Sequence, residues 1–122
     1  MKKQQQQRLA FLIIETEPSQ NLSTRKLLLE SAKHTVINAF GAEEGLQLFK
    51  RFPNVDAVII DSEMSGCSRV AKMIKDQIPN IPLVCLDARI GAKSSWANKT
   101  ISAHDPAELL KMLEEMGGRT DI

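Results

Sequence analysis

Residues Asp56–Asp61, with the sequence DAVIID, decide the fold of this chain. A short run that is apolar on both faces is typical of a central strand in a parallel sheet covered by helices on its two sides. Two other stretches follow the same design, in which an apolar run ends in an acid. They are Leu9–Ile14, which is followed by Glu15, and Ile81–Asp87. Three such strands predict a parallel sheet.

Helical patterns separate these strands. Apolar residues recur at helical spacing in Leu22–Lys33, in Ala42–Phe52 and around Val70–Gln77, and a short strand with Val36 and Ile37 is predicted between the first two helices. The last helix has the clearest start. Asp105 is placed to be its N-cap, Pro106 its first residue and Glu108 the third residue of a capping box. Strands that alternate with helices predict an α/β fold with crossover connections.

The acids that end the strands are the candidate functional residues. In open parallel sheets, ligands bind outside the carboxyl ends of the strands. Glu15, Asp61 and Asp87 each end a strand, so the sequence places three carboxylates along one edge. Two outcomes stay open: the acids share a divalent ion, or one of them is neutralised by a raised pKa or paired with a nearby cation.

Composition narrows the classes of function. The 122 residues carry a formal net charge of +1 with both signs interspersed, which argues against a nucleic-acid-binding surface. No apolar run approaches the roughly 20 residues that span a bilayer, and no secretory signal is present, so we expect a cytoplasmic protein without membrane contact. No Gly-rich phosphate loop or Ser-His-Asp order occurs, and an independent enzyme is not predicted. Residues 1–8 are expected to be a disordered leader, 9–117 one domain and 118–122 a polar tail.

The order of these motifs resembles the receiver domains of two-component response regulators. Four stretches carry the resemblance: Ile13–Pro18 (IIETEP), Ala39–Leu46 (AFGAEEGL), Asp56–Asp61 with the following Met64-Ser65-Gly66, and His104–Leu110 (HDPAELL). The resemblance implies a flavodoxin-like, doubly wound, five-stranded parallel sheet, with Asp61 at the position of the phosphoacceptor aspartate.

Departures from the receiver pattern fall on the residues that carry its chemistry. Receivers hold magnesium with an acidic pair and the phosphoacceptor. By resemblance the pair maps to Glu15 and Thr16, and a hydroxyl is a poorer ligand than a carboxylate. Glu17 would compensate only if its loop turned it inward. We therefore expect at most weak magnesium binding, through Glu15 and Asp61.

Two switch positions are also changed. In receivers a Ser or Thr at the end of the fourth strand hydrogen-bonds the phosphoryl group, and a Lys ends the fifth strand. By resemblance these two positions map to Asp87 and Ser102. A phosphoryl group carries about −1.5 to −2 charge, so Asp87 would repel it, and Ser102 supplies no cation. Phosphorylation of Asp61 by the usual route is disfavoured.

The segment between Asp87 and Ser102 is roughly two helical turns shorter than receivers have there. We expect the fourth helix to be shortened or lost, with Trp96 either filling the vacated space or anchoring a partner. In receivers this helix, the fifth strand and the fifth helix commonly contact partners, so a changed surface implies a changed partner.

Three hypotheses follow for the function. The leading one is a pseudo-receiver, a protein–protein interaction module in a signalling pathway that lacks the usual phosphorylation switch. The second is a divergent receiver that accepts phosphate on Asp61 from a histidine kinase. The third is a flavodoxin-like domain that binds a cation or ligand at the strand ends.

Overall fold

The computed structural model describes residues 8–16, 24–89, 93–103 and 105–118. Strands and helices alternate along these residues. In chain order they are β1 (Ala10–Glu15), α1 (Thr24–Ser31), β2 (Thr35–Phe40), α2 (Ala42–Arg51), β3 (Ala57–Asp61), α3 (Cys67–Gln77), β4 (Leu83–Asp87), β5 (Lys99–Ser102) and α4 (Pro106–Gly118). Glu17, His104, most of the predicted leader and most of the predicted tail lie outside the described residues.

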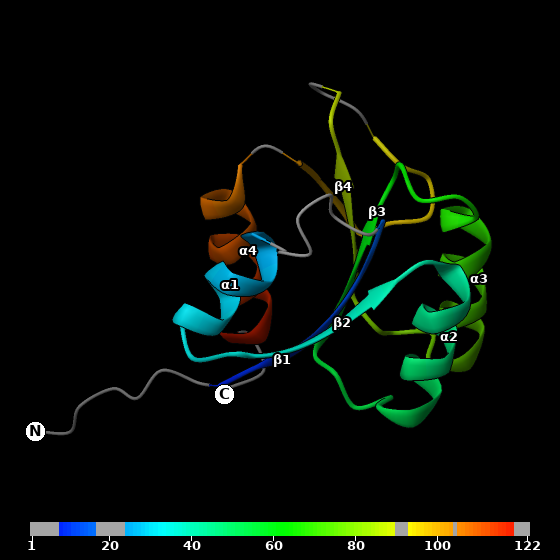
Figure 1. Cartoon of the computed structure of the whole chain (residues 1–122), viewed down its shortest axis with the longest axis horizontal. Helices are drawn as coiled ribbons and strands as arrows, with labels where there is room; N and C mark the ends of the chain where they lie inside the picture. Colours follow the sequence, from blue (N-terminus) through cyan, green and yellow to red (C-terminus); the bar gives the residue numbers. More distant parts are fainter. Residues whose placement is uncertain (1–7, 17–23, 90–92, 104, 119–122) are drawn as a thin grey trace, which may run out of the picture.

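All five strands pair in parallel in the order β2-β1-β3-β4-β5 (Figure 1). The order reverses beside β1, as the doubly wound flavodoxin-like fold requires, and the sequence prediction of this fold is confirmed. β2 and β5 are the edge strands. No helix among the described residues has the length and apolar character needed to cross a bilayer.

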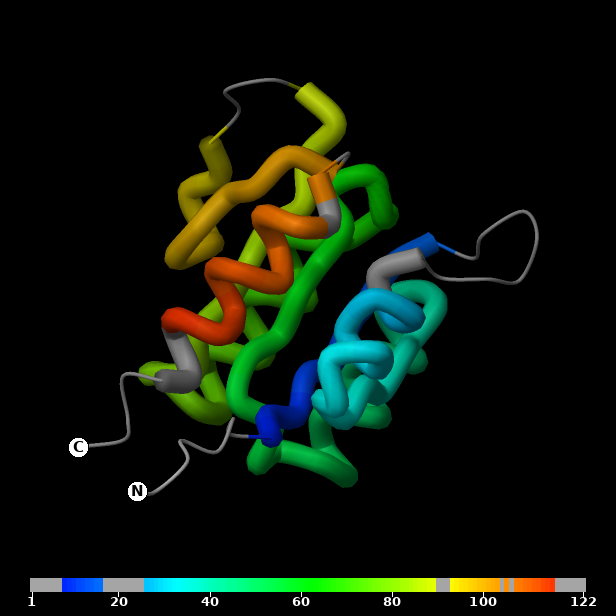
Figure 2. Tube along the Cα trace, turned by 90° about the vertical axis from the view of Figure 1, so that its left-hand side faces the viewer, coloured from blue at the N-terminus to red at the C-terminus, as the bar shows by residue number. Residues whose placement is uncertain are grey.

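Helices cover both faces of the sheet, α1 and α4 on one side and α2 and α3 on the other (Figures 1 and 2). Alternate residues of β1 serve the two layers. Leu12 and Ile14 join the cluster under α2 and α3, while Phe11 and Ile13 join the cluster under α1 and α4. This double coverage explains why the strands are apolar on both faces.

The segment between β4 and β5 contains no helix in its described residues, 88–89 and 93–98. Trp96 is partly buried and packs against the core cluster under α2 and α3. Asn98 completes the connection, since its Oδ1 accepts the Leu83 N–H at 2.8 Å and its own N–H donates to the Leu83 carbonyl at 2.8 Å. The expected loss of a helix agrees with these described residues, and the packing of Trp96 agrees with the expectation that it fills the vacated space.

The ends of two helices refine the sequence predictions. Helix α3 begins at Cys67, ahead of the predicted Val70, after Gly66 in a left-handed conformation (φ 80°). At α4 the N-cap prediction is confirmed, because the Glu108 N–H donates to Asp105 Oδ1 at 3.0 Å. The Asp105 N–H donates to the carbonyl of Ser102 at 3.2 Å. In the predicted capping box the Glu108 carboxylate would accept this N–H, so the backbone of β5 takes the place of that side chain.

Candidate functional site

Glu15, Asp61 and Asp87 lie at the carboxyl ends of β1, β3 and β4, along one edge of the sheet. All three are buried, with exposed fractions of 3%, 9% and 4%. Buried carboxylates require hydrogen bonds or a cation, because burial without either is costly. Their bonding partners therefore decide what this edge can do.

Asp87 is bound by Arg89 in a fork. The guanidinium Nε donates to Oδ1 at 2.9 Å and Nη2 donates to Oδ2 at 2.8 Å, while the Arg89 backbone N–H donates to Oδ1 at 2.9 Å. The Asp87 side chain is 6% exposed and that of Arg89 is 77% exposed. The Asp87–Arg89 pair lies at the end of β4, and the Arg89 side chain faces solvent.

These hydrogen bonds hold the pKa of Asp87 well below its usual range, and the positive charge of Arg89 adds to them against the opposing effect of burial. The same contact raises the pKa of Arg89. A carboxyl neutralised by a raised pKa, one of the two outcomes left open by the sequence, is therefore wrong for Asp87. It is paired with a cation and stays ionised.

Glu15 forms a hydrogen bond with the edge strand β2. Its Oε2 accepts a hydrogen bond from Asn38 Nδ2 of β2 at 2.8 Å. β2 and β3 flank β1 on opposite sides, so this bond ties Glu15 to the neighbouring strand that does not carry Asp61. Thr16, the second member of the expected acidic pair, is exposed. Sequence reasoning missed Asn38, although an amide in the middle of a strand is a signal for such a bond.

Asp61 is bonded within its own loop. Its Oδ1 accepts the Glu63 backbone N–H at 2.9 Å, and its carbonyl accepts the Met64 N–H at 3.1 Å. The carboxylate thereby stabilises the turn that leads from β3 into α3. Asp61 occupies the strand end that the resemblance gives to the phosphoacceptor.

Among the described residues, no group of three or more His, Cys, Asp or Glu side chains is placed to share a metal ion. Magnesium requires near-octahedral oxygen ligands and keeps several waters, so a site with one or two carboxylates needs them to converge. Glu15 is bonded to Asn38 of β2 and Asp87 to Arg89, so each of these two carboxylates already has a partner.

Cys85, the residue of β4 two before Asp87, is buried. Burial and, next to it, the charge of Asp87 together raise the pKa of its thiol to about 11. The thiol stays protonated at neutral pH and is not a nucleophile. Cys67 is half-buried and also free, and its thiol donates to the Ser62 carbonyl at 3.6 Å.

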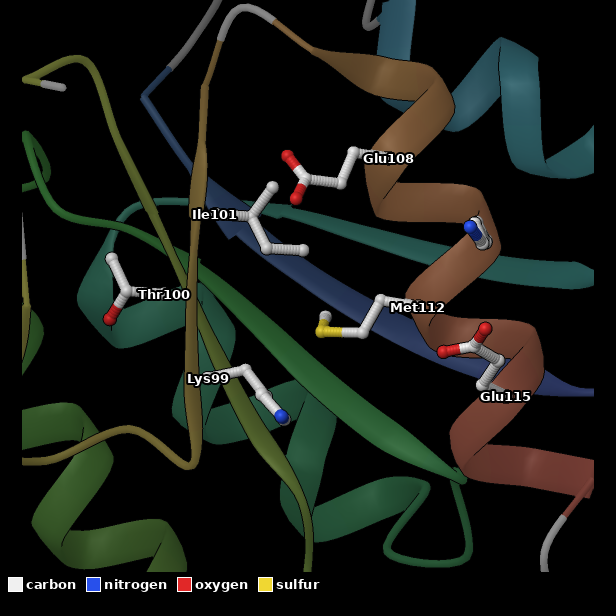
Figure 3. A pocket seen from close by; sticks show the side chains of 7 residues that line it. Lys99, Thr100, Ile101, Glu108, Met112 and Glu115 are labelled. Carbon is white, nitrogen blue, oxygen red and sulfur yellow. The ribbon is translucent and has the colours of Figure 1, made fainter. Parts of the chain in front are cut away.

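A separate groove of about 290 Å³ lies between the edge strand β5 and helix α4. Figure 3 shows Lys99 and Ile101 turned toward α4, and Glu108, Met112 and Glu115 facing them from the helix. The lining is Lys99, Thr100, Ile101, Glu108, Lys111, Met112 and Glu115. It has an apolar floor and a rim with charges of both signs, and no member of the strand-end acids belongs to it.

Neither a protein-family model nor a curated protein matches this chain. Solved structures do. A response regulator receiver domain protein from Clostridium thermocellum has 24% identity and a TM-score of 0.76 over 91% of this chain and 96% of its own. The response regulator TrrA from Thermotoga maritima, in complex with Mg²⁺ and BeF, has 24% identity and a TM-score of 0.71 over 88% and 98%.

The chemotaxis response regulator CheY4 of Vibrio cholerae has 18% identity and a TM-score of 0.73, over 88% of this chain and 98% of its own. These likenesses cover nearly the whole of each neighbour. The chain has the fold of response regulator receiver domains.

Proposed function

We propose that this chain is a receiver-like signalling module that binds a protein partner without the usual phosphorylation switch. The observation that carries the proposal is the Asp87–Arg89 fork. It fixes a buried, ionised carboxylate at the end of β4, where the resemblance expects a hydroxyl that bonds a phosphoryl group.

Charge is the physical reason that this arrangement opposes phosphorylation. A phosphoryl group on Asp61 would bring about −1.5 to −2 charge to an edge that already holds ionised Asp87. Arg89 is the nearest described cation in the sequence after β4, and its fork donors are already bonded to Asp87. Ser102, which ends β5 opposite Asp87, brings no positive charge in place of the expected lysine.

The partner is a protein of a signalling pathway, and the groove between β5 and α4 is the surface that we assign to it. The described residues between β4 and β5 (88–89 and 93–98) form no helix, and this changes this side of the molecule relative to an ordinary receiver. The near-neutral chain, with Lys and Glu side chains alternating around the groove, does not favour nucleic acid. The module has no catalytic activity of its own in this proposal.

Two other functions are alternatives to this proposal. Asp61 keeps its strand-end position and is 9% exposed, so a divergent receiver that accepts phosphate from a histidine kinase is the second candidate. The Thermotoga structure holds Mg²⁺ and BeF, and weak magnesium binding at Asp61 and Glu15 would belong to this candidate or to a cation-binding domain.

A phosphodonor assay separates the proposed function from the phosphorylatable receiver. The purified chain is incubated with magnesium and acetyl phosphate, and its intact mass is measured beside that of the Asp61→Asn variant. We expect no phosphoryl adduct on either protein. An adduct on the wild type that is absent from Asp61→Asn would overturn the proposal in favour of the phosphorylatable receiver.

A further inference from the structure

The His34 imidazole is buried at the opposite end of the sheet from the acids, where the chain enters β2. Its side chain is 1% exposed. Nδ1 lies 3.1 Å from the Leu9 backbone nitrogen and Nε2 lies 2.9 Å from Glu114 Oε2 on α4. The ring meets Phe11 edge-on, with centroids 5.4 Å apart. Figure 2 shows the start of β1 and the later turns of α4 at this same end.

These two contacts specify one tautomer. A backbone N–H can only donate, so Nδ1 must be an unprotonated acceptor for Leu9. In a neutral ring the proton then lies on Nε2, which donates to the Glu114 carboxylate. The geometry therefore describes a neutral histidine with each nitrogen in a different role.

Protonation affects the two bonds unequally. An imidazolium carries N–H on both nitrogens, so Nδ1–H would face the Leu9 N–H and that hydrogen bond would be lost. The Nε2–H donates to Glu114 in both forms, and the positive charge strengthens this contact. Acidification should release the Leu9 N–H and leave α4 attached.

We propose that His34 is an acid-sensitive latch that fastens the beginning of β1 through the Leu9 amide and opens when the imidazole is protonated. The effect is local to the Leu9 amide, because the Leu9 carbonyl still accepts the Thr35 N–H at 2.8 Å and the β5–α4 groove keeps its helix. The latch is independent of Asp61 and of whether phosphorylation occurs.

Other charged groups near this end are held in solvent, where salt screens them. Glu114 is the one charged side chain bonded to the imidazole within the described residues. Lys26 and Glu30 of α1 pair with each other at 3.3 Å, each more than one-third exposed. The remaining charged residues of the surrounding elements are exposed: Arg8 before β1, Lys33 beside His34, Asp56 before β3, and Lys111 and Glu115 on α4.

Adjacent backbone amides provide an internal comparison. The Leu9 N–H donates to His34, whereas the Ala10 N–H donates to Asp56 Oδ2 at 2.8 Å. Amide hydrogen exchange measured by NMR at about pH 8 and about pH 5.5 should show Leu9 losing about tenfold in protection after correction for intrinsic exchange, the size expected for one net hydrogen bond. Ala10 and the buried Leu113 of α4 should keep theirs.

Two variants test the cause. His34→Asn keeps an acceptor oxygen for Leu9 but does not titrate, so protection of Leu9 should become independent of pH. Glu114→Gln keeps an acceptor for Nε2, and the loss at low pH should remain. Equal protection of Leu9 at both pH values in the wild type would overturn the proposal.

A second measurement tests the proposal even if the His34→Asn variant does not fold. Imidazole nitrogen spectra at about pH 8, recorded in a His104→Asn background so that only His34 contributes, should show protonation on Nε2 alone. A proton on Nδ1 would contradict the latch directly.

Discussion

Gly45 in α2 provides a prediction whose size follows from the structure. A Cβ added there would lie 2.7 Å from Ile14 Cδ1, 2.8 Å from Cγ2 and 3.0 Å from Cγ1. Carbon atoms in contact normally lie about 3.5–4.0 Å apart, and Ile14 is fully buried in β1, so neither side has room to move. Gly45 is what lets α2 approach β1 one residue before Glu15.

We expect Gly45→Ala to destabilise the protein. Overpacking costs about 1–3 kcal/mol, and the upper value applies because two of the three contacts are to the stiff branched carbons of Ile14. Alanine returns about 1 kcal/mol of helix propensity. The net loss of about 2 kcal/mol corresponds to a decrease in Tm of about 8 °C for a domain of this size.

Thermal unfolding followed by circular dichroism measures this change. Gln47→Ala, at an exposed position of the same helix, controls for propensity alone and should shift Tm little. Ile14→Val removes the Cδ1 atom, so the Gly45→Ala and Ile14→Val losses should sum to more than the loss of the double variant. A Tm for Gly45→Ala equal to or above that of the wild type would refute the close approach of α2 to β1.

Three further changes test the helix cap and the acidic edge. Asp105→Ala removes the oxygen that caps α4 and should cost about 1 kcal/mol in urea unfolding, whereas Asp105→Asn should cost less; equal losses would contradict the cap. The folded pKa of Asp87 lies below its unfolded value of 3.8, so its pair with Arg89 adds stability above that pH which is lost as pH falls toward the folded pKa. Arg89→Gln should flatten this acid-side loss below pH 3.8, an effect kept small by solvent around Arg89; an unchanged pH dependence there would argue against the fork. Asp87→Thr combined with Ser102→Lys should allow acetyl phosphate to modify Asp61, and failure to do so would locate the block elsewhere.

The sheet was predictable because strands covered on both faces have a local signature. Ala57–Ile60 and Ile81–Leu86 are apolar, and an acid follows each run, so strand type, parallel pairing and the common edge of the acids followed without long-range information. The N-cap at Asp105 was predictable for the same reason, since it depends on a few consecutive residues.

The bonding of the acids was not predictable, because it depends on which way each side chain turns. Glu15 bonds Asn38, which is 23 residues away in sequence and becomes a neighbour only through β1–β2 pairing. Arg89 is only two residues from Asp87, but the sequence does not give the side-chain conformation that turns its guanidinium back onto the Asp87 carboxylate. The close approach at Gly45 likewise depends on how α2 packs on the sheet.

The most direct test of the central claim is an NMR titration of the backbone amides with magnesium, followed by beryllofluoride, which imitates an aspartyl phosphate. The proposed function predicts that the chemical shifts of the amides around Asp61, Asp87 and β5 stay unchanged through both additions. Shifts centred on Asp61 that spread to Asp87 and β5 would contradict it and would show that the phosphorylation switch still works.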